Sequence, residues 1–195
     1  MNIAKNLLAA LGAIFIVLLL IALPKIYAFK STFNEFDPKA METYQGIMNQ
    51  LIETGDGAEA TVWKYKVVEG QTAEDIELSL KTVATEHNIR SVGELPLYQQ
   101  VSSMKGKPYR FVKIYMFCNP LTAANMLDYN DAFSAYLPCR ITVVQDKTGA
   151  FWLYTMNMDL MIYGGKPLPE ALKKEAVHVK EVIQDIMKRT AEGDF

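Results

Sequence analysis

Sulfur-bearing side chains are the residues of this sequence whose types and spacing suit chemistry best. The chain has two cysteines, Cys118 and Cys139, each at the edge of a strand-like run. Thiols in such positions can form a disulfide or redox-active pair, ligate a metal, or pack as small apolar groups. A disulfide needs Cα atoms about 4.4 to 6.8 Å apart, which is possible only if the two strands run antiparallel. The sequence leaves these three alternatives open.

Methionines near the cysteines add further possible ligands for a metal ion. Met156, Met158 and Met161 follow one another closely, and Met116 precedes the first cysteine on a predicted strand. Thioether and thiolate sulfurs select Cu(I), so copper is the cofactor to consider at Cys118, Cys139, Met116 and Met156. Core packing is the favoured explanation of the same methionines, because side chains two positions apart share a face of a strand.

Common catalytic motifs are missing from the sequence. It contains no Gly-x-Ser-x-Gly elbow, no glycine-rich phosphate loop and no dinucleotide fingerprint. His87 and His178 fall on predicted helices, which disfavours a histidine-based zinc site. We interpret Asp128 and Asp131, a possible pair of carboxylates, as part of a solvated loop. The sequence therefore favours a binding or accessory module over an enzyme.

A binding function would use a different set of residues. Aromatic side chains recur on several predicted strands, and a sheet face left open by helices would offer an apolar surface. Arg140 can hold an anionic ligand or pair with a carboxylate. The candidate ligand-binding residues are Asn119, Arg140, Tyr115, Phe117 and Trp152. We expect a small apolar ligand or an envelope protein as partner.

The charge of the chain argues against nucleic acid as a partner. Lys and Arg number 20 and Asp and Glu number 22, so the formal net charge is -2. A nucleic-acid-binding protein usually carries a basic face and a high isoelectric point. We therefore expect no nucleic acid to bind.

An apolar run from Leu7 to Leu23 predicts a membrane segment. It holds 17 residues without a charge, and spanning a bilayer takes about 17 to 25 residues. A cleavable signal peptide is the alternative, but its apolar region usually has about 7 to 15 residues. We therefore predict an uncleaved anchor at residues 1–30. The short tail before it favours a domain outside the cytoplasm, which in a Gram-negative bacterium means the periplasmic side of the inner membrane.

Residues 31–57 are predicted to form a juxtamembrane amphipathic helix or linker. Met41, Tyr44, Met48 and Leu51 recur at helical spacing. We interpret this helix as a stalk packed on the domain. A helix lying in the membrane interface is less favoured, because the polar face has few Lys or Arg residues.

The domain proper is expected at residues 58–195. Alternating and helical spacings predict the following strands and helices: a strand at Thr61–Glu69, a helix after Thr72, a strand at Tyr109–Cys118, a helix at Leu121–Tyr129, a hairpin over 140–163 and a helix from Pro169. Residues 88–107 are predicted to be a loop with at most a short strand at Leu97–Val101. This order predicts an α+β fold, a two-layer sandwich of a mainly antiparallel sheet with helices on one face.

The segment MFCNPLTAANMLDYNDAFSAYLPCRITVVQDKTGAFWL, from Met116 to Leu153, resembles the signature of domain-of-unknown-function family 302. In that signature a hydrophobic strand ends in Cys-Asn-Pro, a short helix follows, and Leu-Pro-Cys-Arg opens the next strand and a hairpin. The layout of residues 58–190 is similar to that of the family as well. The resemblance implies a compact sandwich similar to the TATA-binding-protein-like class and supplies no catalytic residues. A shared fold gives no ground for DNA binding.

Overall fold

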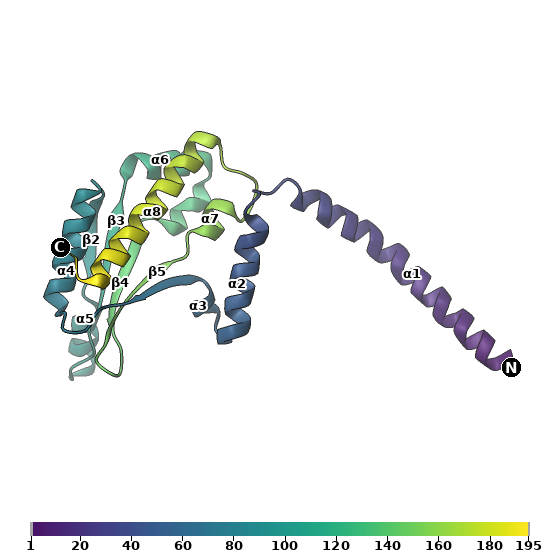
Figure 1. The fold of residues 1–195 in the computed structure, drawn as a ribbon, viewed down its shortest axis with the longest axis horizontal. Coiled ribbons are helices and arrows are strands. Elements are labelled where there is room, and N and C mark those ends of the chain that lie inside the picture. The colour runs from purple at the N-terminus through teal and green to yellow at the C-terminus, as the bar shows by residue number, and fades with distance from the viewer. Residues whose placement is uncertain (1, 195) are drawn as a thin grey trace.

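The computed structural model describes residues 2–194 and places a long N-terminal helix ahead of an α+β domain (Figure 1). The elements, in chain order, are α1 (Asn2–Phe33), α2 (Ala40–Thr54), α3 (Gly57–Ala60), β1 (Val62–Lys66), α4 (Ala73–Glu86), β2 (Arg90–Leu95), α5 (Leu97–Lys105), β3 (Val112–Cys118), α6 (Pro120–Tyr129), η1 (Asp131–Tyr136), β4 (Cys139–Gln145), β5 (Phe151–Met156), α7 (Asp159–Tyr163) and α8 (Glu170–Glu192). The division into residues 1–30, 31–57 and 58–195 stays a prediction, and α1 continues past residue 30 to Phe33.

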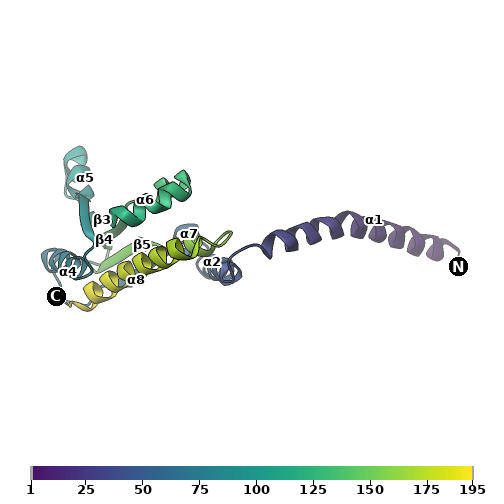
Figure 2. The ribbon, with the colours of Figure 1, turned by 90° about the horizontal axis from the view of Figure 1, so that it is seen from above.

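Five strands form one antiparallel sheet in the order β1-β5-β4-β3-β2. β4 and β5 form the predicted hairpin, and β1 pairs with β5 from the other side. α4 and α8 lie against the same side of the sheet in both views (Figures 1 and 2). The predicted α+β class, with a mainly antiparallel sheet and helices on one face, is confirmed.

The hydrophobic core lies between that face and the two long helices. Alternate strand residues and one stripe of each helix are fully buried there: Tyr115, Phe117, Ile141, Val143, Leu153, Ile76, Leu80, Val83, Ile183, Ile186 and Met187. Each large side chain buried in this way contributes about 1.5 to 3 kcal/mol. The opposite face of the sheet carries half-buried residues such as Ile114, Val144 and Trp152.

α1 extends away from the domain (Figures 1 and 2). Its segment Lys5–Phe33 is the one helix among the described residues that is long and apolar enough to cross a membrane, and its side chains are exposed. A single-pass anchor and a signal sequence are both compatible with this helix. Because α1 adds nothing to the buried core, a chain that begins at residue 31 keeps all the core contacts.

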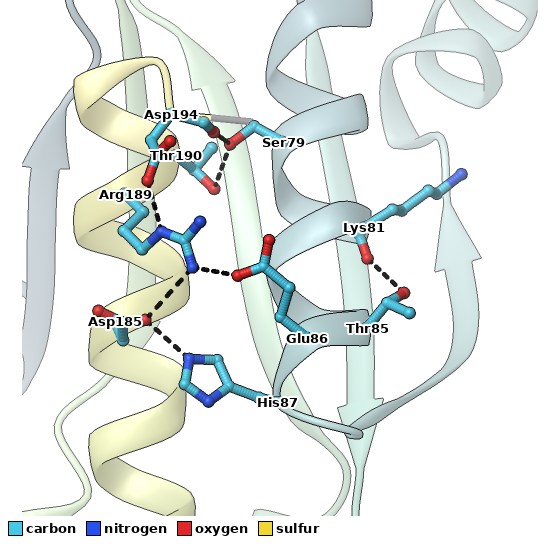
Figure 3. Close-up of polar contacts among 9 residues, drawn as sticks. All are labelled: Ser79, Lys81, Thr85, Glu86, His87, Asp185, Arg189, Thr190 and Asp194. Atoms are coloured by element: carbon cyan, nitrogen blue, oxygen red, sulfur yellow. Dashed lines mark hydrogen bonds and ion pairs between the residues drawn. The ribbon is translucent and has the colours of Figure 1, made fainter.

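Polar contacts join α4 to α8 along their shared length (Figure 3). Arg189 of α8 donates to Glu86 of α4 at 2.5 Å. Deeper between the helices, the Ser79 hydroxyl contacts Thr190 Oγ1 at 3.2 Å and the carbonyl oxygen of Asp194 at 2.5 Å. Ser79 and Thr190 are fully buried, so these bonds satisfy groups that would otherwise destabilise the interface.

A second polar cluster lies between α4 and the sheet. Glu77 accepts hydrogen bonds from Lys113 at 2.6 Å, Lys81 at 2.5 Å and the Tyr115 hydroxyl at 2.9 Å, and Glu94 pairs with both lysines. Burial alone would raise the pKa of Glu77, but these hydrogen bonds outweigh burial and lower the pKa to about 2. The cluster neutralises Lys113, the one charged residue on the inward face of β3.

The lowered pKa of Glu77 makes the stability of the domain depend on pH. In the unfolded chain Glu77 has a pKa near its ordinary 4.5 and in the folded chain about 2. Its ionised form therefore stabilises the fold above pH 4.5, and that contribution is lost as the pH falls from 4.5 toward 2. We expect urea unfolding of the wild type to show a larger drop in stability from pH 6 to pH 3 than unfolding of Glu77→Gln. Equal drops would contradict this assignment.

The prediction of a loop over residues 88–107, with at most a short strand at Leu97–Val101, is wrong. β2 covers Arg90–Leu95 and pairs with β3, and α5 covers Leu97–Lys105. β2 is one of the two edge strands of the sheet, and its residues are mostly exposed. Short, polar edge strands lack the apolar alternation by which a strand is recognised in a sequence.

The predicted hairpin over residues 140–163 is too long at its C-terminal end. β5 ends at Met156, and the short helix α7 follows at Asp159–Tyr163. The Asn157 side chain accepts a hydrogen bond from the Asp159 backbone N–H at 2.9 Å, which starts the turn into α7. Met158 is therefore off the strand and buried, while Met156 stays on the outer sheet face and is 41% exposed.

Candidate functional site

A small apolar cavity lies at the end of the sheet where β3 and β5 finish and β4 starts. Its volume is about 70 Å³, and its walls come from these strands and from α6, η1, α7 and α8. The Cys-Asn-Pro and Leu-Pro-Cys-Arg segments meet here, so we call it the signature cavity. An apolar cavity lined by a few polar groups is the usual form of a small-molecule site.

The Cys-Asn-Pro segment connects β3 to α6, the helix that follows it and lines the cavity. Asn119 caps α6, because its Oδ1 accepts the backbone N–H groups of Leu121 at 3.1 Å and Thr122 at 3.3 Å. Pro120 occupies the first helical position, where its missing N–H costs nothing. On the other side, a cis Leu137–Pro138 bond leads into β4. Asn119 lines the cavity, but its carboxamide oxygen is already engaged in the fold.

Six sulfur atoms line the signature cavity. They belong to two cysteines and four methionines, namely Cys118, Cys139, Met126, Met156, Met158 and Met161. Two of the methionines, Met126 and Met158, are almost fully buried, whereas Met156 reaches the surface. Sulfur is polarisable, so such walls suit apolar groups and soft metal ions alike.

The two cysteines are near neighbours but point to opposite faces of the sheet. β3 and β4 run antiparallel, as a disulfide would require, yet Cys139 is paired with Phe117 and not with Cys118. Both are free thiols. Burial raises the pKa of Cys118, and it raises the pKa of Cys139 to about 11. Both thiols are therefore protonated at neutral pH and are weak nucleophiles.

Arg140 supplies positive charge at the cavity. Its side chain is exposed, it lines the cavity, and it makes no ion pair with any described residue. Of the two roles considered for it, the carboxylate pair is thus not formed within residues 2–194, which leaves the guanidinium available to an anion. Its backbone carbonyl accepts the hydroxyl of the buried Thr155 at 2.7 Å, which ties β4 to β5 at the cavity wall.

Six of the nine candidate residues meet at the signature cavity, and three do not. Phe117, Cys118, Asn119, Cys139, Arg140 and Met156 line it. Tyr115 is fully buried and its hydroxyl is bound to Glu77. Met116 faces outward on β3, opposite Arg140 on the neighbouring strand. Trp152 also faces outward, and its indole N–H donates to Asp146 at 2.9 Å.

Reasoning from the sequence missed the residues that helices bring to the cavity. Ala123 and Met126 come from α6, Phe133 from η1, and Ala176 and Val179 from α8. The helical spacing of Ala176 and Val179 marks them as inward-facing, but no local pattern indicates that they meet the end of β3, more than 50 residues away in the chain. Such contacts between residues far apart in the sequence arise only from the packing of α8 across the sheet.

An α+β sandwich with a cavity at the signature segments defines the class of the protein, and comparison with known proteins identifies the family. The family model described as "Domain of unknown function DUF302" matches residues 65–190. The chain belongs to this family, which confirms the resemblance noted in the sequence. No curated protein matches the chain.

A solved structure supports the same fold. The crystal structure of an uncharacterized conserved DUF302 protein from Bacillus stearothermophilus superposes with a TM-score of 0.53 at 18% sequence identity. The match covers 67% of this chain and 98% of that chain. The relative is thus similar in fold to about two thirds of this chain.

Proposed function

We propose that the domain is a membrane-anchored binding module that takes the apolar end of a small amphipathic molecule into the signature cavity. The observation that supports this proposal is the composition of the cavity walls. Most of the lining side chains are apolar or carry sulfur, and Arg140 lies unpaired at the surface beside them. An apolar interior with a cation at its edge matches a molecule with an alkyl end and an anionic head.

The size of the cavity limits what can enter. An apolar cavity of roughly 150 Å³ holds a benzene molecule, and the signature cavity has about 70 Å³. It therefore accommodates a few heavy atoms, such as the last methylene and methyl groups of a chain. The rest of the molecule would lie along Met156 and Arg140, which are exposed.

The location proposed for this module is the outer face of a cytoplasmic membrane. α1 serves as the uncleaved anchor, and the domain lies on the periplasmic side. The length of the apolar segment Lys5–Phe33 supports spanning. An accessory role without catalysis agrees with the protonated state of both thiols, which makes them weak nucleophiles.

Titration with octanoate and 1-octanol tests the proposed function. We expect the chain of residues 31–195 to bind both probes by isothermal titration calorimetry, with a negative heat-capacity change from burial of the alkyl end. Arg140→Gln should weaken octanoate binding by up to about fivefold, since an exposed ion pair contributes about 0.2 to 1 kcal/mol. The same variant should leave 1-octanol binding unchanged. No heat with either probe would contradict the proposal.

A soft-metal function is the second candidate, because six sulfurs share one cavity. Cu(I) binding would replace the proton of a cysteine, so a bound metal would have to overcome the raised thiol pKa values of Cys118 and Cys139. Elemental analysis of the purified chain, with and without Cys118→Ser, separates the two candidates. About one copper per chain that is lost in the variant would place the metal function first. Metal-free protein whose thiols are both alkylated after unfolding would leave ligand binding as the function.

A further inference from the structure

α2 turns its apolar side chains away from the domain. Five exposed residues at helical spacing form one stripe, which we call the α2 stripe: Met41, Tyr44, Met48, Leu51 and Ile52. Met48 is 53% exposed and Ile52 is 75% exposed. In a helix that packs on a soluble domain, such residues would face the core.

The side of α2 that faces the domain is mostly small or polar, with Ile47 as the apolar exception. Ala40 is the only buried residue of the helix, and Thr43 and Ile47 are half-buried. Between α2 and β1 lies a groove of about 580 Å³ whose lining includes Glu42, Gln50 and other polar side chains. Within the described residues, Met41, Met48, Leu51 and Ile52 of the stripe therefore stay exposed, and Tyr44 alone contacts its neighbours, through Gly164 and Phe33.

Contacts near the N-terminal end of α2 fix the rotation of this helix about its own axis. The backbone N–H of Asp37 donates to the carbonyl of Gly165 at 2.8 Å, and the buried Asp37 carboxylate forms an ion pair with Lys173. One turn into the helix, the Tyr44 hydroxyl donates to the carbonyl of Gly164 at 2.6 Å. These bonds hold the helix on the domain, so the direction of the α2 stripe is a property of the fold.

The position of α2 indicates what covers the stripe. Only residues 34–39 separate it from α1, and in both views α2 is the part of the domain nearest to α1 (Figures 1 and 2). Aromatic rings connect the two helices: Phe33 lies 5.4 Å from Phe29, 4.9 Å from Phe36 and 6.2 Å from Tyr44 between ring centroids. Tyr and Trp side chains concentrate at the level of lipid headgroups, and Tyr44 is the tyrosine of this group.

We propose that the α2 stripe lies in the interface of the bilayer that α1 spans, so that the domain is seated on the membrane. The inference rests on the anchor put forward under the proposed function. Amphipathic helices bind bilayers through buried apolar area and, where they are cationic, through attraction to anionic lipids. α2 carries Glu42 and Glu53 and no Lys or Arg within its length, so its contact with lipid is apolar and needs no anionic headgroup.

Tryptophan fluorescence in brominated lipid tests this contact. The full chain is reconstituted in phosphatidylcholine vesicles, and bromine atoms in the upper acyl chains quench tryptophans that enter the interface. Met48→Trp places the reporter on the α2 stripe, and the matched control Gln50→Trp places it on the groove side of the same helix turn. The native chain, with its two tryptophans, supplies the background.

We expect the tryptophan of Met48→Trp to be quenched several-fold more than that of Gln50→Trp. Equal quenching at both positions would overturn the proposal. A blue-shifted reporter in Met48→Trp that lipid does not quench would also overturn it and would indicate a second protein copy on the stripe. Extraction of the native chain with alkaline carbonate checks the anchor separately: release from the vesicles refutes the anchor, whereas retention without quenching refutes only the α2 contact.

Discussion

Ala123→Leu is expected to weaken octanoate binding at least tenfold while leaving the fold intact. Ala123 lines the signature cavity from α6 and is half-buried. A leucine there adds three carbons to a cavity of about 70 Å³, which leaves no room for two or three methylene groups of a ligand. Each excluded group forfeits about 0.8 kcal/mol of burial, and 1.4 kcal/mol corresponds to a factor of ten in affinity.

The neighbouring residue supplies the control. Ala124 lies on the same helix, is exposed and does not line the cavity. Ala124→Leu changes helix propensity and composition by the same amount as Ala123→Leu. Calorimetric titration of both variants should show wild-type affinity for Ala124→Leu and the loss only for Ala123→Leu. An equal affinity in the two variants would mean that the ligand binds elsewhere.

Phe117→Ala is expected to destabilise the domain by about 3 to 5 kcal/mol, the usual cost of deleting a buried phenylalanine ring. Phe117 is fully buried and belongs both to the core and to the wall of the signature cavity. Its removal merges a new void with an existing one, so neighbouring side chains have little chance to fill the space. Domains of ordinary stability have about 5 to 15 kcal/mol in total, so this variant should be close to unfolding.

Urea unfolding of residues 31–195 measures this loss. Leu121→Ala is the control, because Leu121 is also apolar and lies four residues away but is 78% exposed. Surface substitutions of this kind change stability by about 0.5 kcal/mol or less. A loss below 1 kcal/mol in Phe117→Ala would show that the end of β3 is not part of the core.

Local patterns in the sequence account for most of the fold. The Thr72 to Asp75 spacing predicts the start of α4, and the structure has a complete capping box there. The turn Asp146-Lys147-Thr148-Gly149 closes the β4–β5 hairpin, with Gly149 at φ 94°. These elements are predictable because their signals lie within a few residues. β2 and α5 were not, because an exposed edge strand and a helix without buried residues lack a hydrophobic period.

The candidate site was predictable at the strand ends and not at the helices. Cys118 and Cys139 mark the site because signature segments flank both of them. Strand alternation alone grouped Met116 and Trp152 with the site. Both share the outward face of the sheet with Arg140 and Met156, but neither lines the cavity. The pairing of Cys139 with Phe117 determines which side chains of β3 and β4 lie on the same face of the sheet. This register between strands is a tertiary property, and the alternation of residues within one strand does not reveal it.

Methyl NMR of the methionines tests the central claim most directly. In residues 31–195 labelled with ¹³C at the methionine methyls, the cavity residues Met126, Met158 and Met161 are reporters, while Met104, which is 89% exposed, and Met187 in the core are internal controls. We predict nuclear Overhauser contacts from the terminal methyl of bound octanoate to the three cavity methionines and none to the two controls. Contacts to Met104, or octanoate binding without any contact to the cavity methionines, would contradict the assignment of the signature cavity as the binding site.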